Sequence, residues 1–173
     1  RRKLDMGCTW SSKSTRSFWQ KSSGRGGSCT LGVVDMRAQT QIIAHRGFSG
    51  MYPEHTQRAF EEALKLPIHG IECDVRLTRD GKLVVFHDAT VNRTTNGRGR
   101  VATMDYSDLR ELNSGTEDDP QHILLLDELL ELLSDYPDKH IYIETKHPTR
   151  FGPEVDEQTL RVLRYNHLQD SER

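Results

Sequence analysis

Short apolar runs alternate with amphipathic stretches along the chain from Gln41 onward. Runs of apolar residues with strand-like spacing lie at 42–44, 70–77, 82–86 and 140–146. Stretches with apolar residues at helical spacing lie at 53–66, 127–136 and 153–166, with a shorter one at 107–112. This order of strands and helices predicts an α/β fold with parallel strands.

The predicted helices each have one apolar face. In 53–66 and 127–136 the apolar positions are, in chain order, Ala59, Phe60, Ala63, Leu64, Leu129, Leu130, Leu132 and Leu133. Charged residues fill the opposite faces, so we expect both helices to pack on the sheet. Asp80 and Gly81 predict a tight turn between two strands, and residues 90–101 predict a loop or small hairpin.

Residues 1–40 differ from the rest of the chain and show no sustained periodicity. They are rich in Ser, Gly, Arg and Lys, a composition that buries too little apolar surface to offset the entropy of ordering. The sequence therefore predicts a disordered leader over 1–40, with a nonfunctional leader favoured over a basic interaction arm. One domain is expected over 41–173, and Met36 is a candidate start of translation.

The composition narrows the choice of partners. Lys and Arg number 24 and Asp and Glu 26, so the net charge of -2 indicates no nucleic-acid partner. No apolar run reaches the roughly 20 residues of a membrane-spanning helix, and no secretory signal pattern is present. We therefore expect no integral membrane segment and a cytoplasmic location. The three cysteines, Cys8, Cys29 and Cys73, lack the spacing of zinc ligands.

Residues capable of catalysis lie near the carboxyl ends of several predicted strands. His45 ends the first strand, His87 follows the third, and Glu144 lies near the end of the fourth. Glu72 and Asp74 lie two residues apart in the second strand, so the strand period places both carboxylates on one face. Because α/β barrels build their active sites at this edge, these five residues form a candidate site.

Two carboxylates on a buried strand require a cation, since like charges repel and an unpaired buried charge is costly. Oxygen ligands suit Mg²⁺ or Ca²⁺, and Glu144 would supply a third carboxylate. The alternative is a surface strand whose charges are solvated, but apolar neighbours on both sides favour a buried strand. The sequence thus predicts a divalent-metal site at Glu72, Asp74 and Glu144.

Imidazoles and basic side chains complete the predicted site. His45 and His87 are candidates for donating and accepting protons near neutral pH. Arg46 could bind a nonbridging phosphate oxygen through its planar guanidinium, and Lys146 could add a point charge. A lone histidine at a strand end is usually structural, but two beside three carboxylates favour catalysis. The combination fits cleavage of a phosphodiester, which needs a proton acceptor, a proton donor and a cation.

Seven short motifs follow one another along the chain. They are His45-Arg46-Gly47, Pro53-Glu54-His55-Thr56, Glu72-Cys73-Asp74, Thr78-Arg79-Asp80-Gly81, His87-Asp88, Arg93-Thr94-Thr95 and Ile143-Glu144-Thr145-Lys146. Their order and spacing resemble the glycerophosphodiester phosphodiesterase family. The resemblance implies a TIM barrel of the (β/α)8 type. It also implies a divalent metal held by the three carboxylates, an acid/base pair of His45 and His87, and a phosphate contact from Arg46.

The resemblance also implies a reaction, the hydrolysis of a small-molecule glycerophosphodiester to glycerol 3-phosphate and an alcohol. In that family the substrate's own glycerol hydroxyl attacks phosphorus, and water then opens the cyclic phosphate. Two alternatives stay open. A related phospholipase-type phosphodiesterase would use the same barrel, and a noncatalytic metal-binding or interaction module would keep the pocket without turnover.

Three features depart from the family. His55 stands where Asn is usual, and could contribute a proton or merely replace the amide. Leu124-Leu125-Leu126 replace a Pro-Thr-Leu turn, a change expected to be structural only. A complete barrel takes about 250 residues, so the matched region predicts roughly the first half. Half a barrel leaves unpaired edges, so we expect a fragment with weak or no activity alone that could self-associate through those edges.

Overall fold

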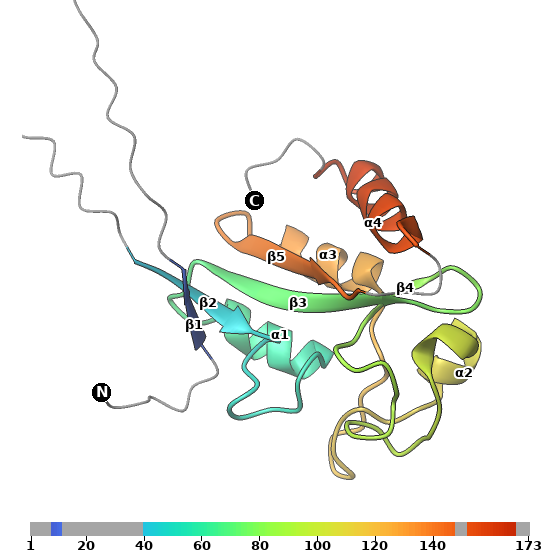
Figure 1. Cartoon of the computed structure of the whole chain (residues 1–173). Helices are drawn as coiled ribbons and strands as arrows, with labels where there is room; N and C mark the ends of the chain where they lie inside the picture. Colours follow the sequence, from blue (N-terminus) through green and yellow to red (C-terminus); the bar gives the residue numbers. More distant parts are fainter. Residues whose placement is uncertain (1–7, 12–39, 148–151, 169–173) are drawn as a thin grey trace, which may run out of the picture.

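A five-stranded sheet lies at the centre of the computed structural model, which describes residues 8–11, 40–147 and 152–168 (Figure 1). The strands are β1 (Cys8–Ser11), β2 (Gln41–His45), β3 (Gly70–Leu77), β4 (Leu83–Val85) and β5 (His140–Thr145). The helices are α1 (Gln57–Leu64), α2 (Tyr106–Arg110), α3 (Leu126–Ser134) and α4 (Glu154–Tyr165), with a short 3-10 helix at Val101–Thr103.

The long strand β3 organises the sheet. It pairs in parallel with β2, where Glu72 lies opposite His45, and in parallel with β5, where Asp74 lies opposite Glu144. The parallel arrangement predicted from the sequence is therefore confirmed for these three strands. Because parallel neighbours present their carboxyl ends at the same edge, the register alone brings the predicted site residues side by side.

β4 departs from the predicted parallel arrangement, because it pairs with β3 in the antiparallel direction. The tight turn predicted at Asp80 and Gly81 explains this. Gly81 has a φ of +76°, a left-handed conformation that glycine adopts without steric cost, and the chain returns along β3. The N–H of Phe86 then donates to the carbonyl of Asp74 (2.9 Å), so His87 is delivered beside the middle of β3.

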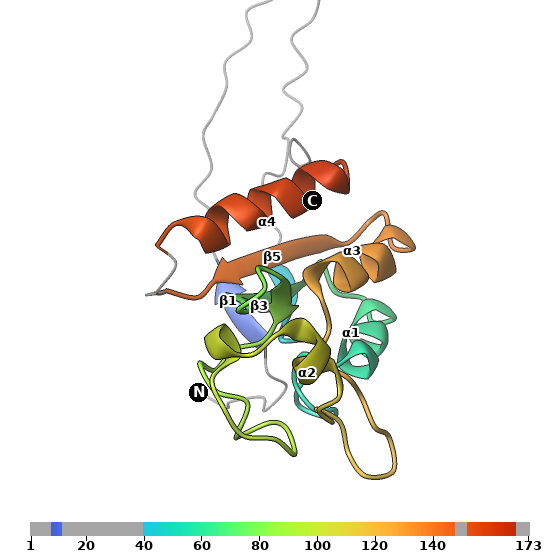
Figure 2. The ribbon, with the colours of Figure 1, turned by 90° about the vertical axis from the view of Figure 1, so that its right-hand side faces the viewer.

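The main core lies between the sheet and the helices α1, α3 and α4, which surround one side of it in Figure 2. Ile71, Cys73 and Val75 of β3 have no exposed surface, and neither do Phe60 of α1 and Leu129 of α3. The face of β3 opposite Glu72 and Asp74 is therefore apolar, as the two-residue period predicts. Burial of this face fixes which side of the sheet carries the carboxylates.

The predicted helices are confirmed with shifted ends. α1 begins at Gln57 and not at Pro53, because Thr56 is the N-cap and its Oγ1 accepts from the Ala59 N–H (3.2 Å). α3 buries Leu126 together with three of the four predicted leucines, whereas Leu132 is only partly buried. The N-cap residue of α3, Leu125, has no side-chain acceptor for the N–H groups of the first turn. Its own backbone N–H donates to the carboxylate of Glu128 (2.8 Å).

A second apolar cluster supports the loop between β4 and α2. It contains Val84, Phe86, Val91, Val101, Tyr106, Leu109 and Ile123. Val91 is completely buried, and a β-bridge joins Thr90 to Arg100 across the loop. The loop or hairpin predicted at 90–101, which carries Arg93, is therefore held in place near both of its ends.

The predicted disordered leader over 1–40, and the domain boundary that follows it, stay predictions. Most of the leader lies outside the described residues. The exception is β1, which pairs with β2 in the antiparallel direction and so adds a strand within the predicted disordered segment. Within the described ranges, no helix is both long and apolar enough to cross a bilayer.

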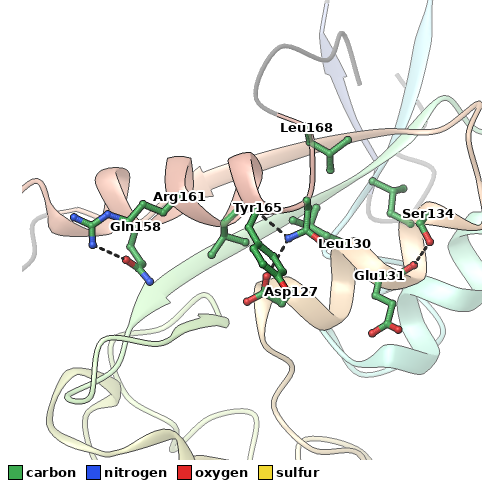
Figure 3. Close-up of a pocket in the computed structure, with 11 residues that line it drawn as sticks. Asp127, Leu130, Glu131, Ser134, Gln158, Arg161, Tyr165 and Leu168 are labelled. Atoms are coloured by element: carbon green, nitrogen blue, oxygen red, sulfur yellow. Dashed lines mark hydrogen bonds between the residues drawn. The ribbon is translucent and has the colours of Figure 1, made fainter.

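A depression of about 720 Å³ lies between α3 and α4 (Figure 3). Tyr165 and Arg161 of α4 and Asp127 of α3 line it, and Asn166 donates to Asp127 across it (3.0 Å). None of the residues predicted to carry chemistry belongs to its lining. We therefore assign it no part in the candidate site.

Candidate active site

The three predicted metal ligands converge in the structure. One carboxylate oxygen from each of Glu72, Asp74 and Glu144 lies within 4.8 Å of the others. The side chain of Asp74 is 1% exposed and that of Glu72 14%, whereas Glu144 is 60% exposed at the open side of the cluster. Two adjacent parallel strands therefore bring together carboxylates that are 70 or more residues apart in sequence.

Both predicted phosphate-binding residues contact this cluster. Lys146 Nζ lies 2.7 Å from Asp74 Oδ1 and also pairs with Glu144. Arg46 Nε lies 3.2 Å from Asp74 Oδ2. The most deeply buried carboxylate thus has a positive charge on each side, which satisfies the requirement that something cationic accompany the buried acids.

The donor set fits a hard divalent cation. Burial, and secondarily the negative charge of Asp74, raises the pKa of Glu72 to about 7, even though the Arg46 backbone N–H donates to its carboxylate (3.0 Å). Neither carboxylate oxygen of Asp74 accepts a hydrogen bond of regular geometry, so ion pairs balance its charge. Converging carboxylates with this surplus of negative charge are typical Mg²⁺ or Ca²⁺ ligands.

The sharp turn after β2 positions Arg46. Arg46 has a φ of 59° and Gly47 a φ of +77°, so two successive residues are left-handed. A Cβ on Gly47 would lie 2.8 Å from the backbone of Ala59, which explains why only glycine fits at this close approach. The turn directs the Arg46 N–H at both the carbonyl (3.1 Å) and the carboxylate (3.0 Å) of Glu72.

The two predicted acid/base histidines flank the cluster. His45 Nε2 lies 3.8 Å from Glu72 Oε2, and the side chain is 35% exposed. Burial, followed by the charge of Arg46, lowers the pKa of His45, which favours the neutral imidazole that can accept a proton. His87 Nδ1 lies 2.7 Å from Asp88 Oδ1, and its side chain is 33% exposed.

Asp88 sets the tautomer of His87. Hydrogen bonds from Arg93 are the main influence that holds the pKa of Asp88 well below its usual range, against the opposing effect of burial. Because the ionised carboxylate can only accept, the His87 Nδ1 must carry a proton. The other ring nitrogen, Nε2, is then the one available for proton transfer.

His55 has a structural part in this geometry. Its side chain is 4% exposed, and burial lowers its pKa to about 3. Its Nε2 accepts the backbone N–H of Asp74 (3.2 Å), so the 3.4 Å approach of this neutral ring to the Asp74 carboxylate is not an ion pair. Of the two roles considered for His55, the geometry favours replacement of the amide over proton transfer.

The sequence motifs contained three further site residues to which no role was assigned. Glu54, Asp88 and Arg93 are connected by hydrogen bonds between charged groups, although Glu54 and Arg93 are 39 residues apart. Their membership of the motifs Pro53-Glu54-His55-Thr56, His87-Asp88 and Arg93-Thr94-Thr95 was the only signal. The spacing along the chain gives no indication that they meet.

Comparison with known proteins decides the family. Residues 45–170 match the model of the glycerophosphoryl diester phosphodiesterase family. The chain belongs to this family. A probable glycerophosphodiester phosphodiesterase 1 of Mycobacterium tuberculosis is 46% identical over 133 residues, which cover 70% of this chain and 48% of that protein. The chain therefore spans about half the length of the curated relatives it matches.

Solved structures of phosphodiesterases share the fold. An Oleispira antarctica phosphodiesterase, solved in complex with its product sn-glycerol-3-phosphate, matches with a TM-score of 0.69 and 33% identity, over 74% of this chain and 53% of that one. A glycerophosphodiester phosphodiesterase of Agrobacterium tumefaciens matches with a TM-score of 0.65 and 32% identity, over 73% and 53%. The predicted fold, part of a TIM barrel, is confirmed.

Proposed function

We propose that this chain provides the metal- and phosphate-binding part of an enzyme that hydrolyses glycerophosphodiesters to glycerol 3-phosphate and an alcohol. The observation that carries the proposal is the convergence of Glu72, Asp74 and Glu144 within 4.8 Å, beside two basic side chains. Membership of the family supports it, and so does the product complex of the Oleispira antarctica relative. The substrate would be a small molecule.

Glu72, Asp74 and Glu144 would hold the divalent cation, Mg²⁺ or Ca²⁺. When bound there, such an ion would offset negative charge on the phosphoryl oxygens. Arg46 and Lys146 place two further positive charges at the same carboxylates, where they would bind and orient the anionic phosphate. Together with the bound ion, these two side chains would supply the positive charge that an anionic diester needs.

His45 and His87 would transfer the protons. Neutral His45 can take the proton of the attacking hydroxyl. His87, in its doubly protonated form and held through Nδ1, would donate the Nε2 proton to the leaving oxygen. The two rings would exchange these roles when water opens a cyclic intermediate. The cytoplasmic location and the self-association of the fragment stay predictions.

Turnover by the full chain tests the proposal. Glycerophosphocholine with Mg²⁺ or Ca²⁺ should yield glycerol 3-phosphate, detected by a coupled dehydrogenase assay. His45→Ala and Glu144→Ala should each lower the rate by roughly 100-fold or more. The matched controls, His167→Asn and Glu131→Gln on exposed positions, should leave it unchanged.

Two outcomes would count against the hydrolase. Metal binding without turnover would support the noncatalytic module in its place. Turnover that survives EDTA, or that His45→Ala leaves intact, would show that other groups perform the chemistry.

A further inference from the structure

The guanidinium of Arg93 bridges two carboxylates that come from different segments of the chain, Glu54 and Asp88. It donates to Asp88 through Nε (2.7 Å) and Nη2 (3.0 Å). It also donates to Glu54 through Nη1 (3.0 Å) and Nη2 (2.7 Å). Four charge-assisted hydrogen bonds in two forks fix the guanidinium plane, which a lysine ammonium could not reproduce.

Each carboxylate that accepts hydrogen bonds from Arg93 also contacts one residue of the proposed chemistry. Asp88 Oδ1, which accepts from Arg93, lies 2.7 Å from His87 Nδ1. Glu54 Oε1 also accepts from Arg46 Nη1 (3.1 Å), and Arg46 in turn approaches Asp74. A continuous series of alternating charges therefore runs from Asp88 through Arg93 and Glu54 to Arg46, and His87 contacts its first member.

The backbone that carries Arg93 is itself anchored. Val91 is fully buried, and its N–H donates to the carbonyl of Gly99 (3.0 Å). The hydroxyl of Thr95 donates to the carbonyl of Val91 (2.8 Å), which closes the turn around Arg93. The guanidinium is thus presented from a fixed loop, although its side chain is 49% exposed.

We propose that Arg93 is a positioning residue, which sets the orientation of His87 through Asp88 and of Arg46 through Glu54. The proposal rests on the proposed function only in giving His87 and Arg46 their tasks. An exposed salt bridge alone contributes little to stability, so we expect Arg93 to act mainly by fixing the orientation of the side chains that it contacts. Its removal would release Asp88 to rotate, and the His87 ring would lose its fixed tautomer.

The tautomer of His87 can be observed without turnover. Long-range ¹H–¹⁵N correlation spectra of the ¹⁵N-labelled full chain, above the pH at which the ring titrates, show which imidazole nitrogen is protonated. The His87→Gln spectrum identifies the signal among the 8 histidines. We expect His87 with Nδ1 protonated in the wild type, and a mixture of both tautomers in Arg93→Gln.

Arg79 provides a matched control outside the site. It donates to Asp105 in the same forked geometry, through Nε at 2.8 Å and through Nη2, and its side chain is 55% exposed. Arg79→Gln should leave the His87 signals unchanged. Arg93→Lys preserves the charge but cannot form both forks, so it should show a partial loss of the fixed tautomer even if Arg93→Gln fails to fold.

The kinetic constants separate the effect of Arg93 on Arg46, through Glu54, from its effect on His87, through Asp88. Glu54→Gln loosens Arg46 and should raise KM more than it lowers kcat, whereas Arg93→Lys should also lower kcat, by about 10–100-fold. An unchanged His87 tautomer in Arg93→Gln or Arg93→Lys would overturn the proposal. A wild-type chain that shows the expected spectra but binds no divalent cation would refute the proposed function while leaving the positioning role supported. Lack of turnover alone would not separate the two, because the chain spans about half the length of its relatives.

Discussion

Replacing Glu72 with glutamine should stabilise the metal-free protein at neutral and alkaline pH, although it removes a proposed metal ligand. The pKa of Glu72 rises from 4.5 to about 7, mainly through burial and then through the charge of Asp74. An acid with a higher pKa in the folded than in the unfolded chain binds more protons when folded, at pH values between the two. The contribution of Glu72 to stability therefore falls as the pH rises through this window, and the loss persists above it.

The size of the effect follows from the same rise in pKa. Each tenfold change in acidity is worth about 1.4 kcal/mol, so a rise from 4.5 to about 7 corresponds to about 3 kcal/mol of stability lost by the ionised form. A glutamine side chain at this position would keep an oxygen that can accept the Arg46 N–H, which Glu72 now accepts at 3.0 Å. The substitution should thus remove the charge with little loss of hydrogen bonding.

Urea unfolding of both proteins in EDTA, from about pH 4.5 to about pH 8, measures this difference. Glu72→Gln should match the wild type at the acidic end and exceed it by up to about 3 kcal/mol at the alkaline end. Saturating Ca²⁺ should narrow or reverse the gap, because it stabilises the protein with the complete ligand set. A stability difference between the two proteins that does not grow across this range, or a variant that is no more stable at about pH 8, would refute the reasoning. The difference is the quantity to compare, because the lowered pKa of His55 makes the stability of both proteins rise with pH over part of the same range.

Substitutions at two further positions, Gly70 and His55, test the framework around the site. Gly70→Ala should lower the free energy of unfolding, measured in urea, by about 1–3 kcal/mol, because the added Cβ would lie 2.3 Å from the His140 carbonyl oxygen of β5. A loss below about 0.5 kcal/mol would show that β3 and β5 can move apart to make room. His55→Leu should cost about 1–3 kcal/mol by leaving the buried Asp74 N–H without an acceptor. His55→Asn, which tolerates the φ of 60°, should recover most of that loss, and equal stability of the two variants would exclude the acceptor role.

Local sequence patterns predicted the parts of the structure that depend on strand and helix period. The alternation in β3 correctly separated Glu72 and Asp74 from the apolar face of Ile71, Cys73 and Val75. The polar strand ends also predicted that the candidate residues would lie at one edge of the sheet, where the register places His45 opposite Glu72 and Glu144 opposite Asp74. These features follow from side-chain direction along one strand, which neighbouring residues determine.

Contacts between distant segments were not predictable in the same way. The Arg93 bridge depends on the antiparallel return of β4 and on the folded loop, which together bring residues 54, 88 and 93 to one place. α1 also starts later than predicted, at the N-cap Thr56, directly after His55 takes the left-handed conformation in which its ring accepts the Asp74 N–H.

The most direct test of the account is whether the three carboxylates hold one divalent cation. Calorimetric titration of Ca²⁺, and separately Mg²⁺, into the full chain should show one ion bound per chain. Glu144→Ala should weaken the affinity by about tenfold or more, while Glu131→Ala on the exposed side of α3 should leave it unchanged. No binding of either ion, or equal affinity in Glu144→Ala, would contradict the claim.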